Sequence, residues 1–203
     1  MQFANYAEFR TQVQRLIDGD DVSQSDFSAT TLDLIISMGE QRLYREVRSS
    51  AQDAALSLVL SSNAATLPSD LLELRSVYFS GYGAIDIVPY ETLIDAQSTG
   101  RVGIAHMAAQ VGDTLVFFPS TSGTLTGRYY KKFPDIADGI TSNTLFARHP
   151  DLFLYAALSE SAPFISDNRL QVWEGKYRAV RDYVNNEEKR RVYSASKLTT
   201  RVA

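Results

Sequence analysis

The spacing of apolar residues changes twice along this chain, and that change limits the folds open to it. Up to Val47, and again after Asn143, apolar residues recur every three or four positions, as on one face of a helix. From Ala54 onward they alternate with polar residues, as in a half-buried strand. The pattern predicts an α+β protein, in which a helical bundle of N-terminal and C-terminal helices is interrupted by a small antiparallel β-barrel or sandwich insert.

Two helices are expected before the insert. Asn5 and Glu8 have the spacing of a capping box, which predicts a helix over residues 5–17. Ser28 can cap a second, longer helix. On that helix Gly39 lies within the apolar stripe and indicates the close approach of a neighbouring helix. The whole stripe consists of Leu32, Ile35, Ile36, Gly39, Leu43 and Val47.

The insert is expected to contain roughly six short strands. Turn residues near Asn63 and at 80–83 predict two hairpins, which join 56–60 to 65–67 and 74–79 to 85–88. Further strands are expected at 107–111, 115–118 and 125–133, with a short helix over 90–97 whose Leu93 and Ile94 face inward. Because the insert leaves and re-enters the helical unit, its ends near 52 and 140 should lie close together.

Helical spacing returns after Asn143. A broad apolar face from Leu152 to Ile165 predicts a helix buried against several neighbours. A final helix carries a narrow apolar seam that ends near Val184 and comprises Leu170, Trp173, Tyr177, Val180 and Val184. The predicted division is therefore a helical bundle domain over 1–52 and 140–188, a β-rich insert over 53–139, and an extended basic C-terminal tail over 189–203.

The charge of the chain is distributed unevenly. The net charge is -4, but the residues from 189 onward contain five cations and no acid, so the rest of the chain carries -4 minus 5, or -9. An acidic body with a basic end is typical of a subunit that docks its terminus on a partner. Proteins that coat nucleic acid would instead need a basic body.

Composition excludes several classes of protein. The chain has no cysteine, so it forms no disulfide and offers no thiolate nucleophile. Its longest apolar stretches are much shorter than the roughly 20 residues that span a bilayer. The polar residues Gln2, Asn5 and Glu8 argue against a signal peptide. We therefore expect the chain to be cytosolic at synthesis.

Few residues suggest catalysis or metal binding. The two histidines, His106 and His149, lack a second ligand at metal spacing, and capping or surface roles are favoured. Acids gather at Asp18, Asp20 and Asp21 and at Asp135 and Asp138, where turn or cap roles are favoured over a carboxylate pair or a calcium loop.

Two groups of cations are candidate binding surfaces. Tyr129 to Lys132 could stack nucleic acid, but on a strand only one tyrosine points to each face, so core packing is favoured. Arg42, Arg45 and Arg48 follow one line along the second helix and can pair either with Glu46 or with acids of a neighbouring subunit.

Five segments, in their order and spacing, resemble one family, the head-to-tail adaptor or neck proteins of tailed bacteriophages. They are 6–9 (YAEF), 40–46 (EQRLYRE), 67–75 (LPSDLLELR), 129–134 (YYKKFP) and 150–158 (PDLFLYAAL). The resemblance spans nearly the whole chain. It implies a virion protein that forms a dodecameric ring beneath the portal, extends the DNA channel and carries the tail nozzle. Such a protein would be made in the host cytoplasm and would not associate with a membrane.

The resemblance also implies which residues meet partners. The final helix and tail, from about Asn185, would reach the portal through Lys189, Arg190, Arg191, Tyr193, Lys197 and Arg201. The loop Ser120, Thr121, Ser122 and Gly123 would meet tail proteins or neighbouring subunits. DNA would pass through the ring without sequence-specific binding, and the family brings no catalytic residue, cofactor or metal.

Two other functions stay open at this stage. A cell-wall hydrolase of a phage tail would use two carboxylates across a scissile bond. A nucleic-acid-binding module would use the basic tail, and its affinity would fall steeply with salt.

Overall fold

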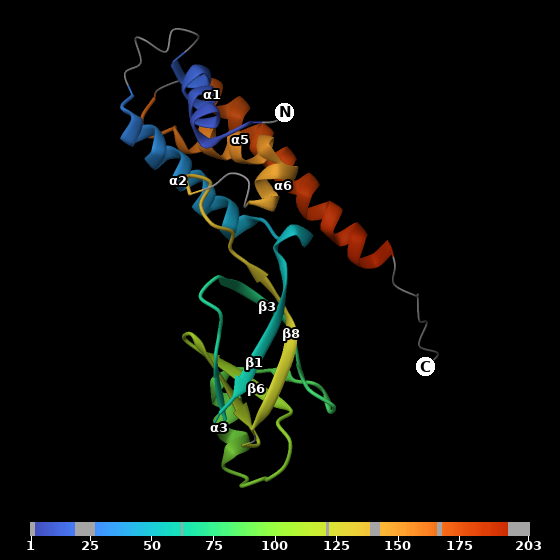
Figure 1. The fold of residues 1–203 in the computed structure, drawn as a ribbon. Helices are drawn as coiled ribbons and strands as arrows, with labels where there is room; N and C mark the ends of the chain where they lie inside the picture. The colour runs from blue at the N-terminus through green and yellow to red at the C-terminus, as the bar shows by residue number, and fades with distance from the viewer. Residues whose placement is uncertain are drawn as a thin grey trace. The chain divides into compact units, whose positions relative to one another are not determined.

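The structure, a computed structural model, describes residues 3–18, 27–61, 63–120, 122–138, 143–165 and 168–194. The chain divides into two compact units, of which the first combines Met1–Ala51 with Phe133–Ala203 and the second is Gln52–Lys132 (Figure 1). The predicted insert ended at 139, whereas the second unit ends at Lys132. No described helix has the length and apolar character that a membrane span requires.

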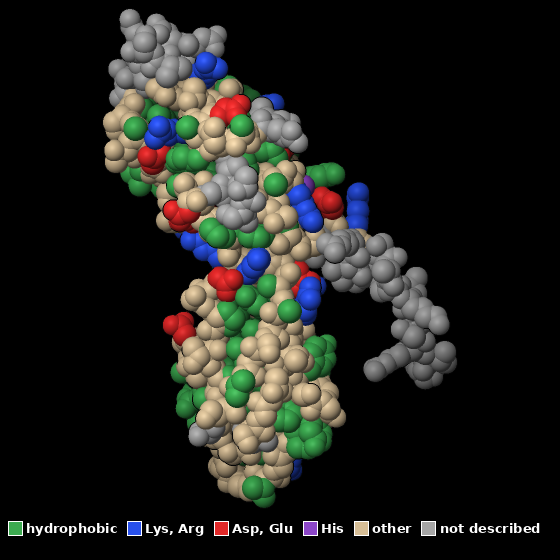
Figure 2. All heavy atoms as spheres, viewed as in Figure 1, with side chains coloured by type: hydrophobic (Ala, Val, Ile, Leu, Met, Phe, Trp, Pro, Cys, Tyr) green, Lys and Arg blue, Asp and Glu red, His purple; other side chains and the backbone are tan. Residues whose placement is uncertain are grey.

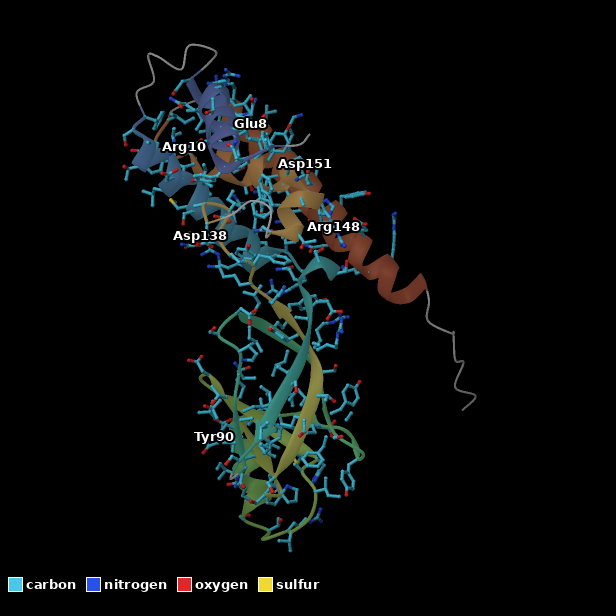
Figure 3. All side chains as sticks on the ribbon, viewed as in Figure 1. Glu8, Arg10, Tyr90, Asp138, Arg148 and Asp151 are labelled. Carbon is cyan, nitrogen blue, oxygen red and sulfur yellow. The ribbon has the colours of Figure 1, made fainter. Side chains whose placement is uncertain are left out.

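The first helix of the helical unit begins with the predicted cap. In α1 (Tyr6–Asp18), Asn5 Oδ1 accepts from the Glu8 amide at 2.9 Å, and the Glu8 carboxylate accepts from the Ala4 amide at 2.7 Å. The first bond satisfies an amide that a helix start leaves unpaired, whereas the second holds the residue that precedes the cap. The helix also bonds to its neighbour, because Arg10 pairs with Asp33 at 3.4 Å; Figure 3 labels Glu8 and Arg10.

The second helix confirms the predicted cap and stripe. In α2 (Ala29–Glu46), Ser28 Oγ accepts from the Thr31 amide at 3.1 Å, and every residue of the predicted stripe is buried. A Cβ added at Gly39 would lie 2.8 Å from the Ala157 nitrogen and 3.0 Å from the Ala156 carbonyl carbon. The close helix approach predicted at Gly39 is therefore confirmed, and its partner is α5.

A short helix and a buried helix follow the β unit. Asn143 caps α4 (Thr144–Arg148) by accepting from the Phe146 amide at 2.9 Å, while its side-chain nitrogen donates to the Tyr44 hydroxyl at 3.1 Å. In α5 (Pro150–Glu160) Pro150 occupies the first turn, where its missing amide hydrogen costs nothing. Most of α5 is buried, including Leu152, Phe153, Leu154, Ala156, Ala157 and Leu158.

The last helix, α6 (Arg169–Ser194), is longer than predicted. Its seam packs as expected, since Trp173, Tyr177 and Val184 are buried. The extended tail predicted from 189 is wrong for its first six residues, because the helix continues to Ser194. Glu187 to Arg191 favour a helix, and neither glycine nor proline occurs between Val184 and Ser194, so the helix can continue. Residues 195–203 lie outside the described part of the chain.

The second unit contains two four-stranded sheets around one apolar cluster and is not a closed barrel. The first sheet has the order β1-β8-β3-β4 and the second β2-β7-β6-β5. All pairs are antiparallel except β5 with β6, which is parallel. The bounds are β1 Asp53–Leu60, β2 Ala64–Thr66, β3 Leu71–Phe79, β4 Gly83–Ala84, β5 Asp86–Ile87, β6 Met107–Val111, β7 Thr114–Phe118 and β8 Gly123–Lys131.

The predicted hairpins are only partly correct. β6 and β7 pair with each other, but β1 pairs with β8 and β2 with β7, so the chain changes sheets where Ser61 bridges Ala64. Likewise β3 pairs with β4, whereas β5 joins the other sheet. The change of sheet lets residues of both sheets share one core, which includes Leu56, Leu58, Phe79, Leu115, Phe117 and Leu125.

Strands β1 and β8 join the ends of this unit, because Asp53 lies opposite Tyr130. Tyr129 is buried and its hydroxyl donates to Asp70 at 3.0 Å, while Arg75 lies 5.0 Å above the Tyr130 ring. These contacts confirm the packing role favoured for the two tyrosines.

Two short helices complete the fold. Helix α3 (Tyr90–Gln97) has the predicted bounds and buries Leu93, but Ile94 is 42% exposed and does not face inward. Tyr90, labelled in Figure 3, opens this helix and is also exposed. A single 3-10 turn, η2 (Ser50–Gln52), leads out of the helical unit.

Candidate functional site

The first half of α6 is fixed to the helical unit by hydrogen bonds as well as by burial. Arg169 donates to the carbonyl oxygens of Leu16 at 3.0 Å and Ile17 at 2.9 Å, which are among the unpaired carbonyls at the end of α1. Its guanidinium also lies 5.1 Å from the Trp173 ring centre. The beginning of α6 therefore has a defined place beside α1.

A charge network centred on Arg42 joins α2, α5 and α6. Arg42 donates to Glu46 at 3.0 Å, to Glu160 at 3.2 Å and to Glu174 at 2.8 and 3.0 Å, and it lies 4.3 Å from the Tyr177 ring centre. The side chain is only 17% exposed, so water screens these bonds less than at an open surface. The network holds the middle of α6 against the other two helices.

The network shifts the acidity of its carboxyl groups. Hydrogen bonds from Arg42, opposed by burial, lower the pKa of Glu174 to about 2. Burial alone would raise the pKa of Glu46, but hydrogen bonds from Arg181 and Arg42 outweigh it and lower that pKa. Both carboxylates are therefore ionised at neutral pH and attract the arginines that hold α6 in place.

The three arginines predicted to lie between subunits have different surroundings. The hydrogen-bonding partners of Arg42 described above belong to its own chain. Arg48 donates to the carbonyl oxygens of Tyr44 at 2.8 Å and Val47 at 2.9 Å, so it closes the end of α2. Arg45 is exposed and has no ion pair among the described residues. Of the three, Arg45 alone presents its charge outward.

Beyond Asn185 the helix α6 carries the predicted basic group. Asn185 makes two bonds to the end of α2: it donates to the Glu46 carbonyl at 3.1 Å and accepts from the Arg48 amide at 3.1 Å. Lys189 and Arg190, which follow, are exposed. Figure 1 shows α6 continuing past α5, and Figure 2 shows Lys and Arg side chains on the surface near its described end.

The other predicted portal contacts are only partly described. Arg191 and Tyr193 belong to the helical backbone of α6, whereas Lys197 and Arg201 lie outside the described residues. Cations in the last turns of a helix are favourable because they face the negative end of its dipole. The basic group thus begins with Lys189 and Arg190, which are exposed on α6.

The predicted tail-facing loop is shorter than expected. Ser120 and Ser122 are exposed, and the Ser120 hydroxyl shares a hydrogen bond with the Asn63 side chain. Thr121 lies outside the described residues. Gly123 is the first residue of β8, where its φ of +154° and a Phe79 ring atom 2.8 Å from an added Cβ both favour glycine.

The histidines and aspartates that are candidates for catalysis or metal binding have structural surroundings. His149 precedes α5 without a side-chain capping bond, and burial lowers its pKa. His106 is exposed. Asp135 and Asp138 form a turn, in which the Asp138 amide donates to the Asp135 carbonyl at 3.0 Å. Asp20 and Asp21 lie outside the described residues, within which no group of three metal-ligating side chains occurs.

Two charge clusters were missed by sequence reasoning. One is the Arg42 network, whose partners Glu160 and Glu174 are 118 and 132 residues away. The other is in the β unit, where Asp53 pairs with Arg128 at 2.6 Å and with Arg75 at 3.2 Å. The only sequence pattern that could have indicated these clusters was the spacing of four residues between opposite charges on a helix, as for Arg42 and Glu46.

An exposed basic pair on the last helix and arginines used mainly to fix helices are features of an assembly protein. The comparison with protein families agrees: the model of the family described as SU10 adaptor protein matches residues 4–201. The chain belongs to this family of phage head-to-tail adaptors, whose members are structural proteins of the virion. No curated protein matches the chain.

Proposed function

We propose that this chain is a ring-forming subunit, dodecameric by resemblance to the neck proteins, that sits between the portal and the tail nozzle and extends the DNA channel. Family membership supports the adaptor role. Within that role, the observation that carries the proposal is the exposed basic end of α6. It follows directly on Asn185, whose bonds to α2 fix the helix at that point.

In this proposal the end of α6 docks on the portal. Residues 186–194 extend the helix about 13 Å beyond Asn185 at 1.5 Å per residue. An acidic groove on the portal would receive Lys189, Arg190 and Arg191, with Tyr193, Lys197 and Arg201 as further contacts. The β unit, including the loop at Ser120 to Gly123, faces the tail nozzle, and DNA passes through the ring without sequence-specific contacts.

Removing the end of α6 tests the docking step. A variant lacking Arg190 to Ala203 keeps Tyr177, Val184 and Asn185, so its far-ultraviolet circular dichroism should change only by the loss of about one turn of helix. Its binding to purified portal rings should weaken at least tenfold. Unfolding of the helical unit on this deletion would refute the assignment of the end to docking.

Charge reversal gives a sharper version of this test. The double variant Lys189→Glu/Arg190→Glu is compared with Arg15→Glu/Arg101→Glu, which changes the net charge equally at exposed positions elsewhere. The first should lose portal binding, and the second should retain it. Wild-type binding should also weaken as salt rises, because exposed charges are screened. Equal effects of both double variants would reject a specific role for the end of α6.

A further inference from the structure

The outer face of α6 carries a row of exposed residues that its own chain leaves uncovered. Val172 is 57% exposed and Tyr183 61% exposed, with the exposed Gly175 and Ala179 between them. The steps of three, four and four residues place all four on one side, away from the buried Trp173. A Cβ at Gly175 would meet nothing within 4 Å, so packing within the chain does not require this glycine.

Helix α2 carries a second row of the same length. Leu34 is 52% exposed, Met38 is half-buried, and Gln41 and Arg45 are exposed. Steps of four, three and four residues place these side chains on the side of α2 away from Gly39, which meets α5. Both rows cover twelve residues, which is eleven helical steps or about 16 Å.

The two rows cannot cover each other within one chain. Both helices pack against α5, and each row lies on the side of its helix opposite the buried residues. Since no described part of the chain covers either row, we look for the partner in another molecule. Every copy of the chain carries both rows, so the row on α6 of one copy can be covered by the row on α2 of another copy.

We infer that the outer row of α6 in one copy docks in parallel on the outer row of α2 in the next copy. This inference rests on the proposed ring. Parallel docking places Leu34 beside Val172, and it places the unpaired Arg45 beside Asp182 and the Tyr183 ring. Asp182 is 60% exposed, so it can accept from a second arginine besides its own Arg181. Antiparallel docking would instead bring Arg45 toward Arg169.

Contacts inside one chain show that parallel docking of α6 on α2 is compatible with a ring. Arg42 pairs with Glu174 and Arg181 with Glu46, while Asn185 meets Arg48, so α2 and α6 of one chain run in the same direction. The small rotation between neighbours in a many-membered ring keeps this direction. Two different faces in contact also form the type of interface that closes into rings, because the same face is never used twice.

The difference in residue number between contacting positions of α2 and α6 is nearly the same between copies as within one copy. Residues in contact within the chain are 132, 135 and 137 positions apart. Docking Leu34 on Val172 gives 172 minus 34, or 138. Neighbouring copies therefore lie side by side with a shift of only a few residues along the helices. A closed ring needs such a small shift, since a larger one would produce a spiral.

Disulfide cross-linking tests the inference directly, because the chain has no cysteine of its own. The double variant Leu34→Cys/Val172→Cys is assembled with portal rings and oxidised, and the same sample is imaged by negative-stain electron microscopy. A disulfide requires Cα atoms about 4.4–6.8 Å apart. We expect a ladder of covalent multimers beyond the dimer on non-reducing gels.

Two matched variants control for position and direction. Leu34→Cys/Gln171→Cys moves one thiol by one residue, about 100° around an exposed part of α6, and should yield little ladder. Leu34→Cys/Tyr183→Cys would cross-link only if the helices docked antiparallel. Val172→Glu, at an exposed position, should leave thermal unfolding of the monomer unchanged while at least tenfold fewer rings form.

The outcomes separate this inference from the proposed function. Rings seen by microscopy without the Leu34–Val172 ladder, or with a Leu34–Tyr183 ladder, would overturn the inference and leave the ring proposal standing. A dimer band alone would show that the two rows do not join each copy to the next around a ring. That result would also overturn the inference. Absence of rings on portal for the unsubstituted chain would reject the proposed function itself, and the inference with it.

Discussion

Replacing Arg42 with methionine should destabilise the helical unit without touching any other subunit. The substitution keeps much of the apolar volume but removes four hydrogen bonds to Glu46, Glu160 and Glu174. Breaking a fully buried charge pair costs about 3–5 kcal/mol. Because these carboxylates are partly exposed, water can recover part of that loss, so a decrease in unfolding free energy of roughly 2 kcal/mol is expected.

The pKa of Glu174 gives an independent estimate of this magnitude. Lowering that pKa from 4.5 to about 2 corresponds to about 3 kcal/mol, but Arg178 contributes to the shift as well as Arg42, and solvent screening leaves roughly 1–2 kcal/mol for Arg42. Since the folded-state pKa is depressed, this stability is present above pH 4.5 and is lost as pH falls through about 2. The difference between wild type and variant should shrink over that window.

Urea denaturation of the monomer, followed by circular dichroism at pH 7 and at pH 2.5, measures both quantities. Arg178→Met is the matched control, because Arg178 also pairs with Glu174 but is 64% exposed and should cost less than about 1 kcal/mol. The reasoning fails if Arg42→Met matches wild type at pH 7, or if its effect appears only at concentrations at which copies associate.

Other predictions concern packing and capping and can be measured by thermal or urea unfolding. Gly39→Ala should lower the unfolding free energy by about 1–2 kcal/mol, because the added Cβ overlaps the α5 backbone. Gly175→Ala, whose Cβ meets nothing, should instead stabilise the monomer by up to about 1 kcal/mol, and equal effects of the two would refute the close approach. Asn143→Ala should cost roughly 2 kcal/mol, since it removes a cap and a buried bond to Tyr44; an effect below about 0.5 kcal/mol would contradict this.

Local features of the helices could be predicted from the sequence because their causes are local. The caps at Asn5 and Ser28 rest on side chains within three residues of the amides they accept from. The close approach at Gly39 followed from its place in an apolar stripe. The bounds of α3 followed from Pro89 and the spacing after it, although the same spacing wrongly placed Ile94 inside.

Features that depend on distant residues could not be predicted in this way. Turn residues at Asn63 indicated a local hairpin, but a core shared by two sheets gives β1 and β2 different partners. Two partners of Arg42, Glu160 and Glu174, are more than a hundred residues away, so of its contacts only the pairing with Glu46 was local enough to be predicted. Because the apolar seam ends near Val184, an extended tail was predicted from 189, but the helix continues to Ser194.

Cryo-electron microscopy of the chain assembled between portal and tail would test the central claim most directly. We predict a closed ring in which the basic end of α6 contacts the portal and the β unit, including Ser120 and Ser122, faces the tail. A ring with the β unit on the portal and the end of α6 free, or a chain bound without forming a ring, would contradict the account.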